Sequence, residues 1–161
     1  MNQAPATTNE TEKSGQIDCL LIPLRDRQLL LPNVTVAEII PFSHLLTTNS
    51  AVDWILGRIN WRGVTIPVIC YEILNNTPAP SPNPGARFAV INGVGSHSQM
   101  PFYGMLVQGI PRLKKVKESE IQQIDAMGKG VLDSMAVAVD GEESAFIPDM
   151  VRVEQSLLKY V

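Results

Sequence analysis

The chain has 161 residues, a length that suits one domain or two small lobes with a shared core. Hydrophobic residues make up 45% of it and charged residues 18%, a composition typical of a globular protein and not of a disordered one. The formal charge of -3 argues against nucleic acid as the main partner, because phosphate binding needs a basic surface. No uninterrupted apolar run is long enough to span a membrane, and the polar N-terminus lacks the apolar core of a secretion signal, so we expect a cytoplasmic protein.

The first third of the chain begins with a polar tail. Residues 1–15 are rich in small polar side chains, and we interpret them as disordered. Two apolar runs within 20–31, separated by a charged break, predict a first β-hairpin. Residues 34–40 alternate only weakly, so both helix and strand remain open there until Pro41 ends the element. We expect 42–53 to form a surface connection.

The stretch 56–69 carries the strongest local signal. Two apolar runs flank Arg62-Gly63, and a two-residue connection that contains glycine predicts a tight β-hairpin. This turn should hold the Arg62 guanidinium out toward solvent, where its planar set of donors suits a carboxylate or several carbonyls of another protein. Pro67 cannot donate to a strand ladder, so we expect its strand to lie at a sheet edge or at a bulge.

The second half of the chain repeats the hairpin theme. Residues 71–74 fit one helical turn, and the proline-rich segment 77–85 predicts a stiff linker between two halves of similar size. Turn signals at Asn92-Gly93, which a long loop follows, and at Asp140-Gly141 each join two apolar strands. Asp149 can cap a final helix whose apolar residues have helical spacing.

Short strands with closely spaced turns indicate an all-β fold class built from small barrels. A parallel sheet would need crossover helices, which the sequence hardly offers. The charged stretch 111–117 gives a mixed pattern, and 119–124 predicts a short capped turn. We therefore predict two packed β-barrels, with a first lobe at 16–76, a second lobe at 86–147 and a C-terminal helix at 149–160.

Candidate catalytic and metal-binding residues are few. Cys19 and Cys70 lie within apolar runs, which favours buried, reduced thiols. Cys70 could act as a nucleophile with His44 or His97 as its base, but their spacing gives no support for such a pair. The cysteines and histidines do not fall in metal-ligand spacing, and we expect neither a metal nor a cofactor.

The remaining features favour a protein-binding module. A compact β scaffold with an exposed arginine and apolar edges binds other proteins through contact area and a few anchoring side chains. A cysteine-dependent hydrolase that uses Cys70 and a small-ligand-sensing β-barrel are the alternatives. Four basic residues form a local patch: Arg112, Lys114, Lys115 and Lys117. We favour the interpretation that this patch is a solvated surface over the alternative that it docks an acidic partner.

Several segments together resemble a known family. Residues 57–69, which read Gly-Arg-Ile-Asn-Trp-Arg-Gly-Val-Thr-Ile-Pro-Val-Ile, resemble the signature of CheW-like domains. Further segments at 29–40, 104–107 and 131–147 resemble other parts of that family in the same order. The likeness covers about residues 16–161.

The resemblance implies two intertwined five-stranded, SH3-like β-barrel subdomains with a short C-terminal helix, and no enzyme activity. It implies an adaptor that couples chemoreceptors to a CheA-type histidine kinase, in the cytoplasm beside membrane-bound receptor arrays. It also implies that the receptor tip and the regulatory barrel domain of the kinase are the partners, and that six residues bind them: Val36, Glu38, Gly57, Arg62, Gly63 and Val107.

Three departures from the family pattern separate this chain from its typical members. Cys70-Tyr71 stand where the family usually has Asp-Leu, and Gln108 stands where Asp usually follows valine. Arg58 replaces an apolar residue. The chain therefore resembles a divergent member, similar to the ChpC-type adaptors of pilus-linked (twitching) chemosensory systems.

Overall fold

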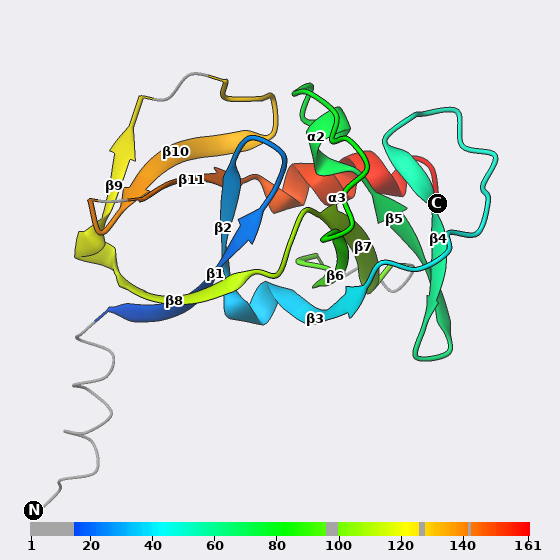
Figure 1. The fold of residues 1–161 in the computed structure, drawn as a ribbon, viewed down its shortest axis with the longest axis horizontal. Coiled ribbons are helices and arrows are strands. Elements are labelled where there is room, and N and C mark those ends of the chain that lie inside the picture. The colour runs from blue at the N-terminus through cyan, green and yellow to red at the C-terminus, as the bar shows by residue number, and fades with distance from the viewer. Residues whose placement is uncertain (1–14, 96–99, 126–127, 142) are drawn as a thin grey trace, which may run out of the picture.

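A computed structural model describes residues 15–95, 100–125, 128–141 and 143–161. The expected tail, apart from Gly15, and His97 lie outside the described residues. The described chain is mainly β, with two sheets, two short 3-10 turns and two helices, so the predicted all-β class is confirmed. Figure 1 shows the two sheets at opposite ends of the molecule, with the C-terminal helix α3 running between them.

The first sheet, sheet A, has six strands in the order β8-β1-β2-β11-β10-β9. Its hairpins β1–β2 and β10–β11 confirm the turns expected near residue 26 and at Asp140-Gly141. The pairing is antiparallel except where β11 meets β2 in parallel, at Phe146 and Leu29. The strands are β1 (Gln16–Pro23), β2 (Gln28–Pro32), β8 (Arg112–Lys117), β9 (Ile121–Ile124), β10 (Asp133–Val139) and β11 (Glu143–Pro148).

The second sheet, sheet B, has five strands in the order β3-β6-β7-β5-β4. It contains the hairpins β4–β5 and β6–β7, and a short parallel contact joins β5 to β7. The strands are β3 (Val36–Pro41), β4 (Ile55–Trp61), β5 (Val64–Ile69), β6 (Arg87–Asn92) and β7 (Phe102–Val107). Strand β3 resolves the choice between helix and strand that the sequence left open at residues 34–40.

Helices are short, as the sequence predicted. Helix α2 (Tyr71–Leu74) is the expected single turn, and α3 (Met150–Leu158) follows Asp149. The Asp149 side chain accepts a hydrogen bond from the Arg152 backbone N–H at 3.1 Å, which caps the helix as expected. The 3-10 turns are η1 (Asn33–Thr35) and η2 (Glu118–Glu120).

The two sheets do not follow the two halves of the chain, which corrects the expected lobe boundaries. Sheet B consists of β3 to β7, from the middle of the chain. Sheet A combines the first two strands of the chain with the last four. The segment 77–85 therefore links two parts of sheet B and does not separate the lobes. Hydrophobic periodicity reports only local structure, so it could not show that β2 pairs with β11, more than a hundred residues away.

Sheet A also has one strand more than the predicted five. The charged stretch at 111–117 forms β8, and β9 occupies 121–124 after a single 3-10 turn. Both are edge strands, and β8 buries only Val116 completely among its six residues. Because an edge strand can expose most of its side chains, its sequence lacks the apolar alternation of a half-buried strand.

The core is divided into three parts, one inside each curled sheet and one between the sheets. Inside sheet A lie Cys19, Leu21, Leu30, Val116, Val137, Val139 and Ala145. Inside sheet B lie Ile59, Ile66, Val68, Phe88 and Val90. The largest cluster lies between the sheets, where α3 contributes Met150, Val153 and Leu157. Each sheet thus encloses apolar side chains of its own, and the shared cluster packs the two together.

A buried polar cluster also joins the two sheets. Asp133 on β10 accepts hydrogen bonds from Tyr71 Oη at 2.9 Å and from Asn75 Nδ2 at 3.0 Å. The Arg27 guanidinium, from the turn between β1 and β2, makes an ion pair with the same carboxylate. Asp133 is 4% exposed, so these donors satisfy a carboxylate that would otherwise be costly to bury.

Candidate functional site

The tip of the β4–β5 hairpin holds Arg62 and Gly63 in the left-handed region of backbone space. Their φ angles are 49° and 79°, and positive φ at both central residues defines the type I′ turn. Gly63 adopts this conformation without steric cost, whereas Arg62 is one of only three non-glycine residues with positive φ in the described chain. The predicted tight hairpin is confirmed.

The Arg62 side chain is 70% exposed but is held in place by an intramolecular ion pair. Its Nη2 and Nε atoms lie 3.1 Å and 3.2 Å from Oε1 of Glu38 on β3. Trp61 Nε1 donates to the same oxygen at 2.9 Å, and the Arg62 guanidinium lies 5.2 Å from the centre of the Trp61 ring. We call Glu38, Trp61 and Arg62 the edge cluster.

The edge cluster connects strands that lie at opposite edges of sheet B. In the sheet order β3 is first and β4 is last, so contact between Glu38 and Trp61 requires the sheet to curl until its edges meet. The hydrogen bond from Trp61, together with the neighbouring Arg62 charge, lowers the pKa of the Glu38 carboxyl. The ion pair of Glu38 and Arg62 therefore lies on the surface where the two edges of sheet B meet.

The other expected site residues lie inside the molecule or at its margin. Val107 at the end of β7 is fully buried, and Val36 is partly buried against the core between the sheets. Gly57 is buried on β4, where an added Cβ would lie 2.6 Å from the Leu46 carbonyl oxygen. Of the six residues, Glu38, Arg62 and Gly63 thus form the accessible group, and the others support the fold beneath it.

Two features of this region were missed by the sequence analysis. Trp61 lies within the predicted hairpin, but nothing in the sequence showed that its indole would reach Glu38. Leu46, within the expected surface connection, pairs with Arg58 through two backbone hydrogen bonds of 2.7 Å and 3.0 Å. A single bridge of this kind leaves no periodic pattern in the sequence.

Pro67 does not lie on an edge strand, which corrects one expectation. Strand β5 runs between β4 and β7, but its pairing with β7 begins only at Val68. Because the Arg58 peptide groups bond Leu46, the Arg58–Pro67 pair is a non-hydrogen-bonded pair of the antiparallel ladder. The backbone N–H that proline lacks would therefore point away from β4, toward the side of β5 where β7 is not yet paired.

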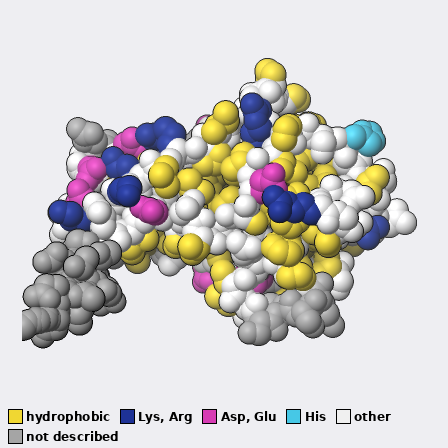
Figure 2. All heavy atoms as spheres, turned by 90° about the horizontal axis from the view of Figure 1, so that it is seen from below, with side chains coloured by type: hydrophobic (Ala, Val, Ile, Leu, Met, Phe, Trp, Pro, Cys, Tyr) yellow, Lys and Arg dark blue, Asp and Glu magenta, His cyan; other side chains and the backbone are white. Residues whose placement is uncertain are grey.

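Three of the four basic residues in the expected patch are paired with carboxylates. Arg112 makes an ion pair with Glu143 at 2.6 Å, Lys114 with Asp140 at 2.7 Å and Lys115 with Asp18 at 3.7 Å. Figure 2 shows the same alternation, with charged side chains of both signs gathered at the sheet A end and hydrophobic ones across the middle of that face. This pairing favours the solvated-surface interpretation over an acidic partner.

The environment of Cys70 opposes nucleophilic chemistry. The residue is 1% exposed, and burial raises the pKa of its thiol to about 12. Its side-chain contact is with the Glu72 carboxylate at 3.5 Å, and burial raises the pKa of that carboxyl too. Because the thiolate is the reactive form, a thiol in this setting is inert at neutral pH.

Within the described ranges, no group of three or more His, Cys, Asp or Glu side chains is placed to hold a metal ion. No helix of the described chain is both long and apolar enough to cross a membrane.

Comparison with known families identifies the chain. The model of the CheW-like domain matches residues 18–157. The chain belongs to the CheW-like domain family. This membership indicates a chemosensory adaptor role, and it agrees with the resemblance of the hairpin signature.

A solved structure supports the fold independently. The crystal structure of scaffolding protein TtCheW from Thermoanaerobacter tengcongensis superimposes with a TM-score of 0.69. The match covers 82% of this chain and 88% of that chain at 16% sequence identity, so it concerns the fold alone. No curated protein sequence matches the chain.

Proposed function

We propose that this protein is a non-catalytic adaptor that couples chemoreceptors to a CheA-type histidine kinase. The observation that carries the proposal is the edge cluster, in which an exposed guanidinium is held at a fixed place on the closing edge of a barrel. Arg62 uses two of its nitrogen atoms on Glu38, so further donors remain for an acceptor on another protein.

The mechanism would be physical bridging. The hairpin tip and the neighbouring β3 edge would contact the related β-barrel domain of the kinase, and another face would receive the helical tip of a receptor. The ion pair with Glu38 and the Trp61 ring limits the conformations of the arginine, which reduces the entropy lost when a partner binds. The adaptor would work in the cytoplasm beside receptor arrays.

Binding assays with the whole chain test this proposal. Pull-down with a kinase regulatory domain and with a receptor cytoplasmic fragment, at low salt, should retain both partners. Replacing Arg62 with alanine should weaken one of the two contacts about tenfold, the loss expected when one anchoring side chain of an interface is truncated. The Arg112→Ala variant, which also removes an exposed, ion-paired arginine, should bind like the native protein. Failure of the native chain to bind either partner would overturn the proposal.

We further propose that the system served is a pilus-linked one, as in ChpC-type adaptors. The departures at Arg58, Cys70 and Gln108 support a divergent member, and the structure gives two of them local roles: Cys70 is core, and Gln108 accepts from Asn83 Nδ2 at 3.2 Å. Deleting the gene should reduce twitching in a surface assay while swimming is unaffected. The opposite pattern would place the adaptor in a flagellar pathway.

The two alternatives have less support. A cysteine-dependent hydrolase needs an accessible thiolate, whereas Cys70 is buried and protonated. A ligand-sensing barrel needs an interior cavity, whereas both sheets enclose packed apolar side chains.

A further inference from the structure

Arg58 differs from every other arginine of the chain in the state of its guanidinium. Arg25, Arg27, Arg62 and Arg112 make ion pairs, and Arg87 and Arg152 donate to backbone carbonyls. Within the part of the chain that the structure describes, the Arg58 side chain has no hydrogen bond and no ion pair. Its five donors face solvent without an acceptor from the protein.

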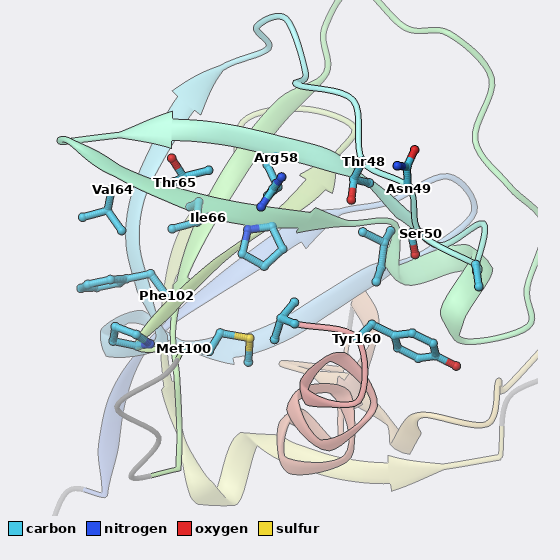
Figure 3. A pocket seen from close by; sticks show the side chains of 15 residues that line it. Thr48, Asn49, Ser50, Arg58, Val64, Thr65, Ile66, Met100, Phe102 and Tyr160 are labelled. Atoms are coloured by element: carbon cyan, nitrogen blue, oxygen red, sulfur yellow. The ribbon is translucent and has the colours of Figure 1, made fainter.

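This unpaired guanidinium lines a cavity of about 460 Å³ beside β5. Figure 3 shows the Arg58 guanidinium beside the β4–β5 hairpin, between the labelled side chains of Ile66 and Thr48, with Met100 and Phe102 beyond β5 in this view. All five residues line the same pocket. Among the described residues that line the cavity there is no Asp or Glu, and Arg58 has the only charged side chain of that set. Val161 also borders the cavity, but its carboxylate makes no ion pair with Arg58. The described side chains of the lining therefore carry a net positive charge, and this charge suits a carboxylate from outside the chain.

The wall formed by β5 also offers unpaired backbone groups. The Arg58–Pro67 pair is non-hydrogen-bonded, and alternation along an antiparallel ladder gives the same character to the pair of Asn60 and Thr65. The N–H and C=O of Thr65 thus point away from β4 and toward the cavity. Because β7 pairs with β5 only from Val68 onward, no described residue of that ladder is a partner for Thr65.

We propose that this groove binds an extended, acidic peptide segment of a partner protein. A carboxylate of the segment pairs with Arg58, its backbone bonds the peptide groups of Thr65, and an apolar side chain packs against Phe102 and Met100. A strand added to a sheet edge gains affinity from main-chain hydrogen bonds, and the pockets beside it select the side chains. The segment can enter beside residues 64–67 of β5, where β7 is not paired with that strand.

This contact uses other residues than the edge cluster, which carries the proposed kinase contact. The cavity lining includes none of the three residues of the edge cluster. Arg58 is also a position where the chain departs from the family pattern.

Selection from a displayed library of random short peptides, with the whole protein as bait, tests the proposal. Enriched peptides are synthesised with blocked ends and titrated by fluorescence anisotropy. They should carry an acidic residue, and Arg58→Ala should weaken their binding about tenfold, as loss of a charged anchor does. Thr65→Pro should also weaken binding, because it removes the outward donor at a position of the same ladder type as Pro67.

Two controls keep this test decisive. Arg112→Ala removes an exposed strand arginine from the other sheet and should leave peptide affinity unchanged, and unfolding curves should show that Arg58→Ala retains the fold. The proposal is overturned if no peptide is enriched, if enriched peptides lack acidic residues, or if they bind Arg58→Ala as tightly as the native chain. A response of the Arg58 Nε–H resonance to free acetate but not to the peptides would also overturn it, in favour of a small-anion site.

Discussion

At the scale of single residues, the chemistry of the surface follows from which charges are paired. Glu38 accepts hydrogen bonds from Trp61 and Arg62. Glu143 pairs with Arg112, and Asp140 pairs with Lys114. Each of these carboxyl groups has a lowered pKa, caused first by a side-chain hydrogen bond. Arg58 alone among the arginines has a guanidinium with neither an ion pair nor a hydrogen bond to any described residue, which makes it the arginine most available to an outside group.

The Glu38→Gln substitution should make stability less dependent on pH. Because the folded-state pKa of Glu38 lies below its usual value of 4.5, the carboxylate contributes stability above that value and loses it as pH falls through the lowered pKa. The native chain should therefore be more stable than Glu38→Gln at neutral pH, and the difference should vanish in acid.

Urea unfolding of both proteins from neutral pH down to about pH 3 measures this difference. The matched control is Glu118→Gln, which changes an exposed carboxylate on η2 that makes no ion pair with any described residue. If the difference in free energy of unfolding between the native chain and Glu38→Gln is the same at every pH, the charge of the Glu38 carboxylate contributes nothing to stability.

At the scale of elements, the β4–β5 hairpin is the feature on which the candidate site depends. Its type I′ turn places Arg62 at the tip, and the non-hydrogen-bonded positions along β5 turn Thr65 toward the groove. The sequence predicted this hairpin because a glycine between two apolar runs is a local signal. It could not predict that the tip would meet β3, since that contact depends on how far the sheet curls.

Gly63→Ala should destabilise the hairpin by about 1–2 kcal/mol, because a Cβ at φ 79° clashes with the backbone whatever the surrounding space. Space is not limiting, since no atom of another residue beyond the chain neighbours lies within 4 Å of the place that a Cβ would take. Gly63→Asn should cost less, because asparagine tolerates the left-handed region.

Equilibrium unfolding in urea compares the two variants. Equal stability of Gly63→Ala and the native chain would contradict the assigned turn. If Gly63→Asn loses as much stability as Gly63→Ala, the glycine has a role other than its backbone conformation.

At the scale of the whole molecule, the two sheets are held together by an apolar cluster and by the buried group around Asp133. Tyr71 and Asn75 come from the middle of the chain, whereas Asp133 lies on β10 of sheet A and Arg27 in the turn that joins β1 and β2 of that sheet. The interleaved topology means that neither sheet is formed by one continuous half of the chain. We therefore expect the two sheets to unfold as one cooperative unit.

Asp133→Ala should lower the free energy of unfolding by about 3–5 kcal/mol, because it leaves the buried Arg27 guanidinium without its partner. Asp18→Ala, which removes an exposed ion pair with Lys115, should cost less than about 1 kcal/mol. Urea unfolding followed by tryptophan fluorescence gives both values. A small effect of Asp133→Ala would mean that water or another acceptor replaces the carboxylate, and that the apolar cluster alone joins the sheets.

The sequence by itself determined the all-β class, the four hairpins, the C-terminal helix with its cap and the outward position of Arg62, because each depends on a turn residue or a spacing within a few neighbours. Only the tertiary structure decided which strands share a sheet, that Val107 and Gly57 are buried, and that Glu38 closes the barrel on Trp61. Those outcomes depend on pairings between distant residues, and such pairings are selected by the packing of the whole chain and leave no local pattern.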